Sequence, residues 1–160
     1  MTDRYQSLAH HPIGKFVVKN LGLPNPPVLE RWTEGSPLVR GTVLVGSAPH
    51  STIGAKLNAS LKSSGIEAVG VRADSRRYKG LVFDATGIAD TAGLAVMQQF
   101  FTPALRSLAS SGRLIVLGTL PEQASSETAA IAQRALEGFV RSAGKEIGRA
   151  SCRERVSSVV

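Results

Sequence analysis

The stretch that most constrains this chain runs from Gly112 to Ile147, where a short apolar run, a loop and a long amphipathic segment follow one another. Residues 114–117 are all aliphatic and too few for a helix, which predicts a strand buried on both faces. Gly112 is expected to close the preceding helix. Apolar residues then recur at steps of three and four, which predicts a helix over residues 126–147 with one buried stripe. The stripe comprises Ala129, Ala132, Leu136, Phe139, Ala143 and Ile147.

Three further apolar runs predict strands at residues 42–45, 66–71 and 80–85. Helices are expected from the turn at 46–54 to about residue 64, and from about residue 91 to residue 110 with a kink at Pro103. The link between the second and third strands is too short for the extra helix and strand of a six-strand Rossmann pattern. We therefore expect an α/β fold with a doubly wound, parallel, flavodoxin- or Rossmann-like sheet of four strands in the order 2-1-3-4, the fifth strand being missing.

Composition limits the classes of protein to which the chain can belong. Its 160 residues are 42% apolar and 19% charged, which allows one domain with a proper core. No apolar run is long enough to span a membrane and no secretory pattern begins the chain, so we expect a cytoplasmic protein without a membrane partner. The formal charge of +7 is scattered, and its densest group, residues 72–79, is expected to be a solvated loop with no nucleic-acid partner. Cys152 is the single cysteine, and His10 and His11 have no further ligand beside them, so no metal site is expected.

The chain divides into three expected parts. Residues 1–40 are a leader that packs on the domain, residues 41–148 are the domain itself, and residues 149–160 are a tail. The string EIGRASCRERV, from Glu146 to Val156, looks like the in-frame translation of a sequencing-adapter oligonucleotide. We therefore expect the tail to be non-native and the gene to have been truncated at this point.

Residues 112–146 resemble the short-chain dehydrogenase/reductase superfamily, in which G-R-I-V-x-I-x-S is followed by Y-x-x-x-K and by a helix ending A-L-x-G-F-x-R-S-L-x-K-E. Within that superfamily, the chain is similar to the N-terminal domain of the high-molecular-weight 3-oxoacyl-[acyl-carrier-protein] reductases. The strings FFTPALRSL at 100–108, LVFDATGI at 81–88 and IAQRALEGFVRSAGKE at 131–146 carry this likeness. In those proteins a flavodoxin-like domain precedes a complete ketoreductase domain that performs the chemistry, and this second domain is not in the chain.

The resemblance implies where the family's catalytic residues would fall. Its serine lies near Thr119, its tyrosine at Ala129 and its lysine at Gln133. The family's mechanism needs a phenol as proton donor and an ammonium group beside it, and neither a methyl group nor an amide can replace them. We therefore expect no catalytic residue and no cofactor for this chain alone. The parent protein would reduce β-ketoacyl thioesters of acyl-carrier protein or CoA with NADPH or NADH.

The turn after the first strand, GSAPHSTIG, is where a Rossmann fold would hold a pyrophosphate. The superfamily pattern G-x-x-x-G-x-G keeps Gly46 and Gly54 but has Thr52 in place of the middle glycine. A side chain at that position obstructs the close approach of a pyrophosphate to the backbone. Ser47, Ser51 and Thr52 could still hold a single phosphate at a helix N-terminus, or Ser51 could be only the helix N-cap.

Two single residues leave alternatives open. Asp84, at the end of the third strand, is either a residue of a binding site or the cap of a turn. Gly138 lies inside the last helix, where glycine costs about 1 kcal/mol relative to alanine, so another helix or the sheet is expected to approach it closely.

Two functional hypotheses follow from the sequence. In the first, the chain is the non-catalytic N-terminal domain of a 3-oxoacyl-[acyl-carrier-protein] reductase. The resemblance then implies that helices 91–110 and 126–147 meet the missing reductase domain or a second copy. In the alternative, the chain is a small flavodoxin-like module that binds a flavin or a phosphorylated ligand at Ser47–Gly54.

Overall fold

The computed structural model describes residue 11 and residues 30–150, so most of the expected leader and nearly all of the expected tail lie outside the described residues. It confirms the α/β fold with a parallel sheet in the order β2-β1-β3-β4. The strands are β1 (Val43–Ser47), β2 (Ala68–Val69), β3 (Tyr78–Asp84) and β4 (Leu108–Leu117). The helices are α3 (Gly54–Ser63), α4 (Leu94–Ala104) and α5 (Glu127–Ala150), with short 3-10 turns η1 (Leu105–Ser107) and η2 (Pro121–Gln123).

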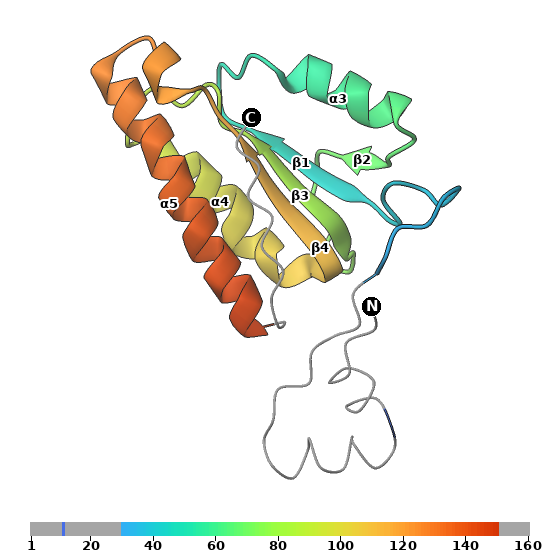
Figure 1. Ribbon diagram of the computed structural model, residues 1–160. Coiled ribbons are helices and arrows are strands. Elements are labelled where there is room, and N and C mark those ends of the chain that lie inside the picture. The colour runs from blue at the N-terminus through green and yellow to red at the C-terminus, as the bar shows by residue number, and fades with distance from the viewer. Residues whose placement is uncertain (1–10, 12–29, 151–160) are drawn as a thin grey trace.

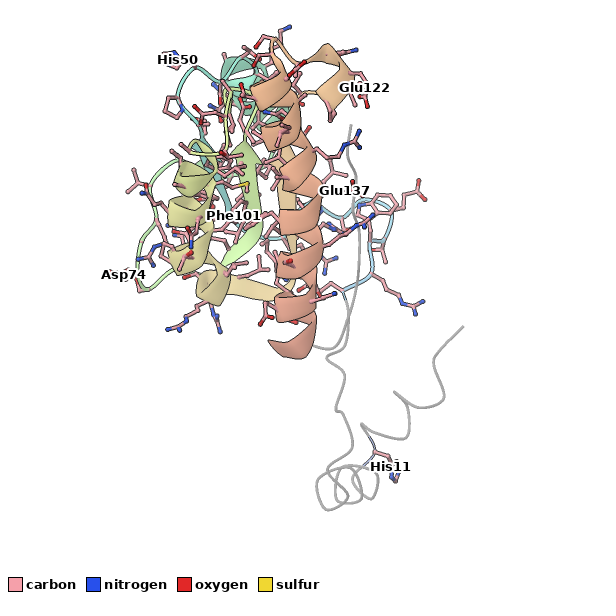
Figure 2. All side chains as sticks on the ribbon, turned by 90° about the vertical axis from the view of Figure 1, so that its left-hand side faces the viewer. His11, His50, Asp74, Phe101, Glu122 and Glu137 are labelled. Atoms are coloured by element: carbon pink, nitrogen blue, oxygen red, sulfur yellow. The ribbon has the colours of Figure 1, made fainter. Side chains whose placement is uncertain are left out.

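Helices α4 and α5 cover one face of the sheet and α3 lies over the other (Figure 1). The core is concentrated on the α4 and α5 side, where aromatic rings stack between the layers. The ring centroid of Phe83 on β3 lies 5.1 Å from that of Phe100 and 5.9 Å from that of Phe101. Phe101 in turn lies 5.1 Å from Phe139 of α5, and Figure 2 shows it beside that helix. These contacts fix both helices against the sheet.

The opposite face is thinly covered. α3 has no buried residue, and its Leu57 and Leu61 are only partly shielded. Ile115, on the edge strand β4, keeps 39% of its surface exposed. The helices therefore cover the two faces of the sheet unequally. Most of the apolar burial that stabilises the chain comes from the face covered by α4 and α5. In the described part of the chain, no helix is both long and apolar enough to cross a membrane.

The predicted bounds of the helix at residues 91–110 are both wrong, because the observed helix is shorter at each end. α4 starts at Leu94 and stops at Ala104, and residues 108–110 already belong to β4. The reason lies in Pro103, which has no N–H to donate to the carbonyl of Gln99, so the helix gives way to the turn η1. Gly112, expected to close this helix, lies inside β4 instead.

β4 is irregular where it begins. Its register with β3 passes from Tyr78 opposite Leu108 to Gly80 opposite Arg113, so that residues 109–112 face the single residue Lys79. The Lys79 ammonium uses the widened ladder, since its Nζ lies 2.7 Å from the Ser110 carbonyl and 2.6 Å from the Glu30 carboxylate. The hydrogen bond from Lys79 lowers the pKa of Glu30, so this exposed pair is intact at neutral pH and is lost when acid protonates Glu30.

β2 is much shorter than the strand predicted for residues 66–71. It pairs only with Val43 and Leu44, which leaves the carboxyl half of β1 without a neighbour on that side. The cause is the link of residues 70–77, which must return the chain to the start of β3. Parallel strands usually need a crossover of about a dozen residues, and this link has fewer. The Ala73 N–H donates to the Tyr78 hydroxyl at 2.8 Å and holds the link near the amino end of the sheet.

Two glycines differ in what surrounds them. A Cβ at Gly46 would lie 2.5 Å from the ring of Phe100, so β1 and α4 approach each other here as closely as glycine allows. A Cβ at Gly138 would have nothing within 4 Å, so the close approach predicted at Gly138 is wrong within this chain. α5 packs through the opposite side of the helix and leaves Gly138 exposed.

We predict opposite effects for alanine at these two positions. Gly46→Ala should lower the free energy of unfolding by about 1–3 kcal/mol, because the new methyl group overpacks the Phe100 contact. Gly138→Ala should raise it by about 0.5–1 kcal/mol, because it improves helix propensity in open space. Urea unfolding followed by circular dichroism measures both, and a neutral Gly46→Ala variant would show that Phe100 does not pack on β1.

Candidate functional site

The helix predicted for residues 126–147 is confirmed as α5. Its first turns carry Ala129 and Gln133, the positions at which the resemblance to short-chain dehydrogenases would place a tyrosine and a lysine. Ser126 caps the helix, since its Oγ accepts the Ala129 N–H at 3.2 Å. Ala129 and Gln133 follow at helical spacing and are both buried, with 4% and 5% of their surfaces exposed. Both positions therefore point into the protein, at the carboxyl end of the sheet.

The carboxamide of Gln133 is engaged by backbone groups from two loops. Its Nε2 donates to the carbonyls of Ala85 and Ile88, both at 2.9 Å. Its Oε1 accepts the N–H of Thr119 at 2.8 Å. Gln133 thus joins the loops that follow β3 and β4 to α5, and Thr119 takes part through its backbone rather than its hydroxyl. None of these groups can donate a proton to a substrate as a phenol does.

Little space remains beside these residues. The cavity next to Thr119 and Gln133 measures about 80 Å³, and its other contacts are largely apolar. Sites for small molecules usually enclose about 300–1,000 Å³. A nicotinamide and a thioester do not fit together in this volume.

The second candidate position lies between the carboxyl ends of β1 and β3, where the sheet order reverses and doubly wound folds bind ligands. Asp84 ends β3 here and is completely buried. Its Oδ1 accepts both the N–H of Thr86 at 3.1 Å and the hydroxyl of Thr86 at 2.6 Å. Its Oδ2 accepts the N–H of Ile53 at 3.3 Å, just before α3 begins. Of the two alternatives for Asp84, this geometry matches the turn cap.

Ser51 and Thr52, which were predicted to hold an anion, form hydrogen bonds with Asp84 and Thr86 instead. Thr52 donates its N–H to the Thr86 hydroxyl at 3.0 Å, and the Ser51 hydroxyl donates to the Asp84 carbonyl at 2.9 Å. Ser51 is therefore not the N-cap of α3, and that alternative is wrong. The N-cap residue is Ile53, which has no capping side chain, and the carboxylate of Asp84 takes that place from another strand.

The two loops also touch directly. A Cβ at Gly87 would lie 2.0 Å from the carbonyl oxygen of Pro49, so only glycine permits this contact between the loop after β3 and the loop after β1. Ser47 is exposed at the end of β1 and Gly54 begins α3 on either side of the contact. Figure 2 shows His50 of the first loop at the same end of the molecule as Glu122 of η2. The backbones of the two loops are thus in contact at the end of the crevice between β1 and β3, and the space beside Ser47, Gly54 and Asp84 opens toward α3 and α4.

Electrostatics act against an anion at this position. The N-terminus of α3 carries partial positive charge that would attract a phosphate. The carboxylate of Asp84 already faces it and accepts the Ile53 N–H. A phosphate would have to displace this carboxylate or lie beside its negative charge.

A tyrosine and a lysine are adjacent elsewhere, but in the wrong place for the family's chemistry. Tyr78 is completely buried at the amino end of β3. Lys79 follows it and is paired with Glu30 and the Ser110 carbonyl. The sequence has one other tyrosine, Tyr5, which lies outside the described residues. The described chain therefore brings no tyrosine and lysine together at the carboxyl end of the sheet.

Sequence reasoning missed the role of Thr86 and the contacts of Gln133. A signal existed for each. Asp84 and Thr86 are two residues apart after a strand, a spacing at which a side chain commonly bonds the local backbone. Gln133 follows Ala132 and precedes Leu136 by three, which places a polar group on the buried stripe. A buried amide requires partners.

Comparison with known proteins adds no family to these observations. No family model matches the chain, and no curated protein matches it. In the described part of the chain, no group of three or more histidine, cysteine, aspartate or glutamate side chains is placed to hold a metal ion.

We predict that Gln133→Ala lowers the free energy of unfolding by about 2–4 kcal/mol, because two carbonyls and one N–H lose their partner and a cavity forms. Gln98→Ala, on the exposed side of α4, is the matched control and should change it by less than about 0.5 kcal/mol. Gln133→Glu places a carboxyl against two carbonyls, which raises its pKa in the folded state. This variant should therefore lose more stability at about pH 8 than at about pH 4. Equal urea midpoints for Gln133→Ala and Gln98→Ala would contradict the role of Gln133 in joining the two loops to α5.

Asp84→Asn is predicted to destabilise the chain by about 1–3 kcal/mol, because an amide NH₂ would face the Ile53 N–H in place of an acceptor. Asp74→Asn is the control, since the Asp74 side chain is 91% exposed and pairs only with Arg72. Thermal unfolding compares the two variants, and amide exchange at Ile53 and Thr86 reports whether the loops separate. Unchanged exchange in Asp84→Asn would be evidence against the network.

Proposed function

We propose that this chain is a non-catalytic structural domain of a two-domain 3-oxoacyl-[acyl-carrier-protein] reductase. The second domain of that parent, supplied by the rest of the protein, would reduce β-ketoacyl thioesters of acyl-carrier protein or CoA with NADPH or NADH in the cytoplasm. The observation that carries the proposal is Gln133. It occupies the family's lysine position, and its carboxamide is committed to three backbone groups.

The chemistry of the neighbouring positions agrees with a structural role. Ala129 offers only a methyl group where a proton donor would be needed, and that group is buried. Thr119 contributes its N–H to the Gln133 contact. With a cavity of about 80 Å³ beside them, these residues support the fold and leave no room for a reaction.

The partner in this proposal meets the chain through α4 and α5. Ile131 exposes 61% of its surface on α5 although it is strongly apolar. Ala135, Gly138 and Ser142 are exposed at successive helical steps from it, so a second helix could approach this uncharged face closely. The close approach that Gly138 lacks inside the chain is thus available to the reductase domain or to a second copy. The rest of this interface would come from α4, whose observed range is 94–104 rather than the predicted 91–110.

The alternative, a module that binds a flavin or a phosphorylated ligand at Ser47–Gly54, has less physical support. Two of the N–H groups that precede α3 are already bonded, Thr52 to Thr86 and Ile53 to Asp84. Ser51 donates its hydroxyl to the backbone of β3. A phosphate would therefore have to displace these bonds to use the N–H groups of Thr52 and Ile53.

A direct assay tests the proposal. The purified chain, mixed with NADPH or NADH and acetoacetyl-CoA, should oxidise neither nucleotide faster than buffer, and the protein should be colourless. A turnover that Thr119→Val abolishes would overturn the structural role, and bound flavin absorbance would favour the alternative. The parentage is tested separately, by sequencing the genomic DNA downstream of the Glu146 codon. A frame that continues into a domain with serine, tyrosine and lysine in the family's spacing is expected, and an immediate stop codon would contradict it.

A further inference from the structure

A groove of about 970 Å³ runs along the free edge of β1, between α3 and α4. Figure 1 shows this edge facing α3 and the short strand β2, away from β3. Both faces of the sheet contribute apolar walls to the groove. These walls include Val45, Leu57, Ile66, Val69, Val96 and Phe100.

On the edge that faces the groove, the carboxyl half of β1 has no strand partner in the part of the chain that the structure describes. β3 pairs with β1 along its whole length, and the Thr42 carbonyl and the Ala48 N–H both bond β3. Backbone groups alternate in direction along a strand, so the amide of Ser47 points to the other side. β2 ends at Val69, opposite Leu44, and no other described strand lies beyond it.

The link of residues 70–77 cannot easily fill this edge. Continuing the register would set Gly70 opposite Val45 and Val71 opposite Gly46. The remaining residues would then have to span the sheet back to Tyr78, at no more than about 3.3–3.6 Å each. Val71 instead leaves the sheet with 83% of its surface exposed. The short link therefore explains why β2 does not cover the carboxyl half of this edge, which no residue of the described ranges pairs with.

We propose that this groove binds an extended segment of a partner polypeptide, which adds to β1 as a strand. A row of backbone donors and acceptors is recognised best by another backbone. Side chains of an added strand point alternately to opposite faces. One set would contact Leu57 of α3, and the other would contact Val96 and Phe100 of α4. An apolar small molecule would leave the Ser47 amide without a partner.

The charged side chains of the groove indicate which residues the bound segment should carry. The ionisable side chains that line the groove are Lys62 and Asp84. The carboxylate of Asp84 is buried and already accepts hydrogen bonds from Ile53 and Thr86, whereas Lys62 is exposed at the end of α3. The rim of the groove therefore carries a positive charge, and the whole chain has a formal charge of +7. The segment is apolar at alternate positions and carries acidic side chains.

The helices on either side of the groove also limit which kind of strand can pair with β1. Because α3 and α4 rise on either side of the edge, β1 of a second copy cannot reach it to form a flat continuous sheet. A single extended segment enters where a folded sheet cannot. The groove has no residue of α5 in its lining, but it shares α4 with the interface of the proposed function, through Val96 and Phe100. The peptide test is read at Ser47 of β1, so its outcome is distinguished from that of the proposed function.

The test uses the full chain, labelled with ¹⁵N, and a synthetic acetylated peptide of about seven residues in which valine alternates with threonine between terminal glutamates. We expect the peptide to bind and to slow amide hydrogen exchange at Ser47. Lys62→Glu should weaken binding about threefold, as expected for an exposed charge pair. Lys56→Glu makes the same charge change on α3 outside the groove and should leave binding unchanged. A peptide with proline at the valine positions, which lacks the N–H groups, should not bind.

Three outcomes would overturn the proposal. The first is no slowing of exchange at Ser47 at saturating peptide. The second is equal weakening by Lys56→Glu and Lys62→Glu, which would indicate general attraction to a basic protein. The third is protection of Ser47 that grows with protein concentration and without peptide, which would make a second copy the occupant. Both lysines are exposed, and an unchanged amide spectrum of each variant verifies that it is folded.

Discussion

The buried carboxylate of Asp84 is the interaction on which the carboxyl end of this sheet depends. A charge removed from water is tolerated only when hydrogen bonds replace its hydration, and Asp84 finds them in Ile53 and Thr86 on two different loops. Gln133 does the same for the loops after β3 and β4. Together the two side chains bind three loops to one another. In a doubly wound fold these loops ordinarily frame a ligand, and here the side chains of Asp84 and Gln133 and the Ile53 N–H are instead bonded within the chain.

The order of the strands could be predicted because short apolar runs alternate with helical segments. The prediction that residues 114–117 are buried on both faces is wrong, because β4 is an edge strand without a buried residue. The stripe of α5 was equally plain, since all six of its positions recur at steps of three and four residues and four of them, Ala129, Ala132, Leu136 and Ala143, are buried. Element ends were less predictable. β2 stops early because a link elsewhere in the sequence is short, and α4 stops at a proline whose effect on the following residues depends on the strand they join. Gly138 was misjudged because composition does not show which side of a helix a neighbour covers.

For the candidate site, the sequence predicts which side chains are missing and not which contacts replace them. The sequence indicates that Ala129 and Gln133 lack the chemistry of a phenol and an amine, but it does not show what replaces them. The partners of Gln133 lie 45, 48 and 14 residues away along the chain. Ile53 and Asp84 are 31 residues apart. Such contacts arise only when the sheet has brought its loops together, so local patterns carry little information about them.

The irregular start of β4 has a further consequence for the solubility of the chain. A free edge strand of ten residues exposes a row of backbone groups that can template pairing between molecules and lead to aggregation. The surplus residues 109–112 distort the start of this edge, and the charged Arg113 follows them at once. A copy that approaches in register meets a distorted ladder and a cation in place of a flat strand. The shift in register that brings the Ser110 carbonyl to Lys79 thus also makes the start of this edge a poorer template for pairing with another strand.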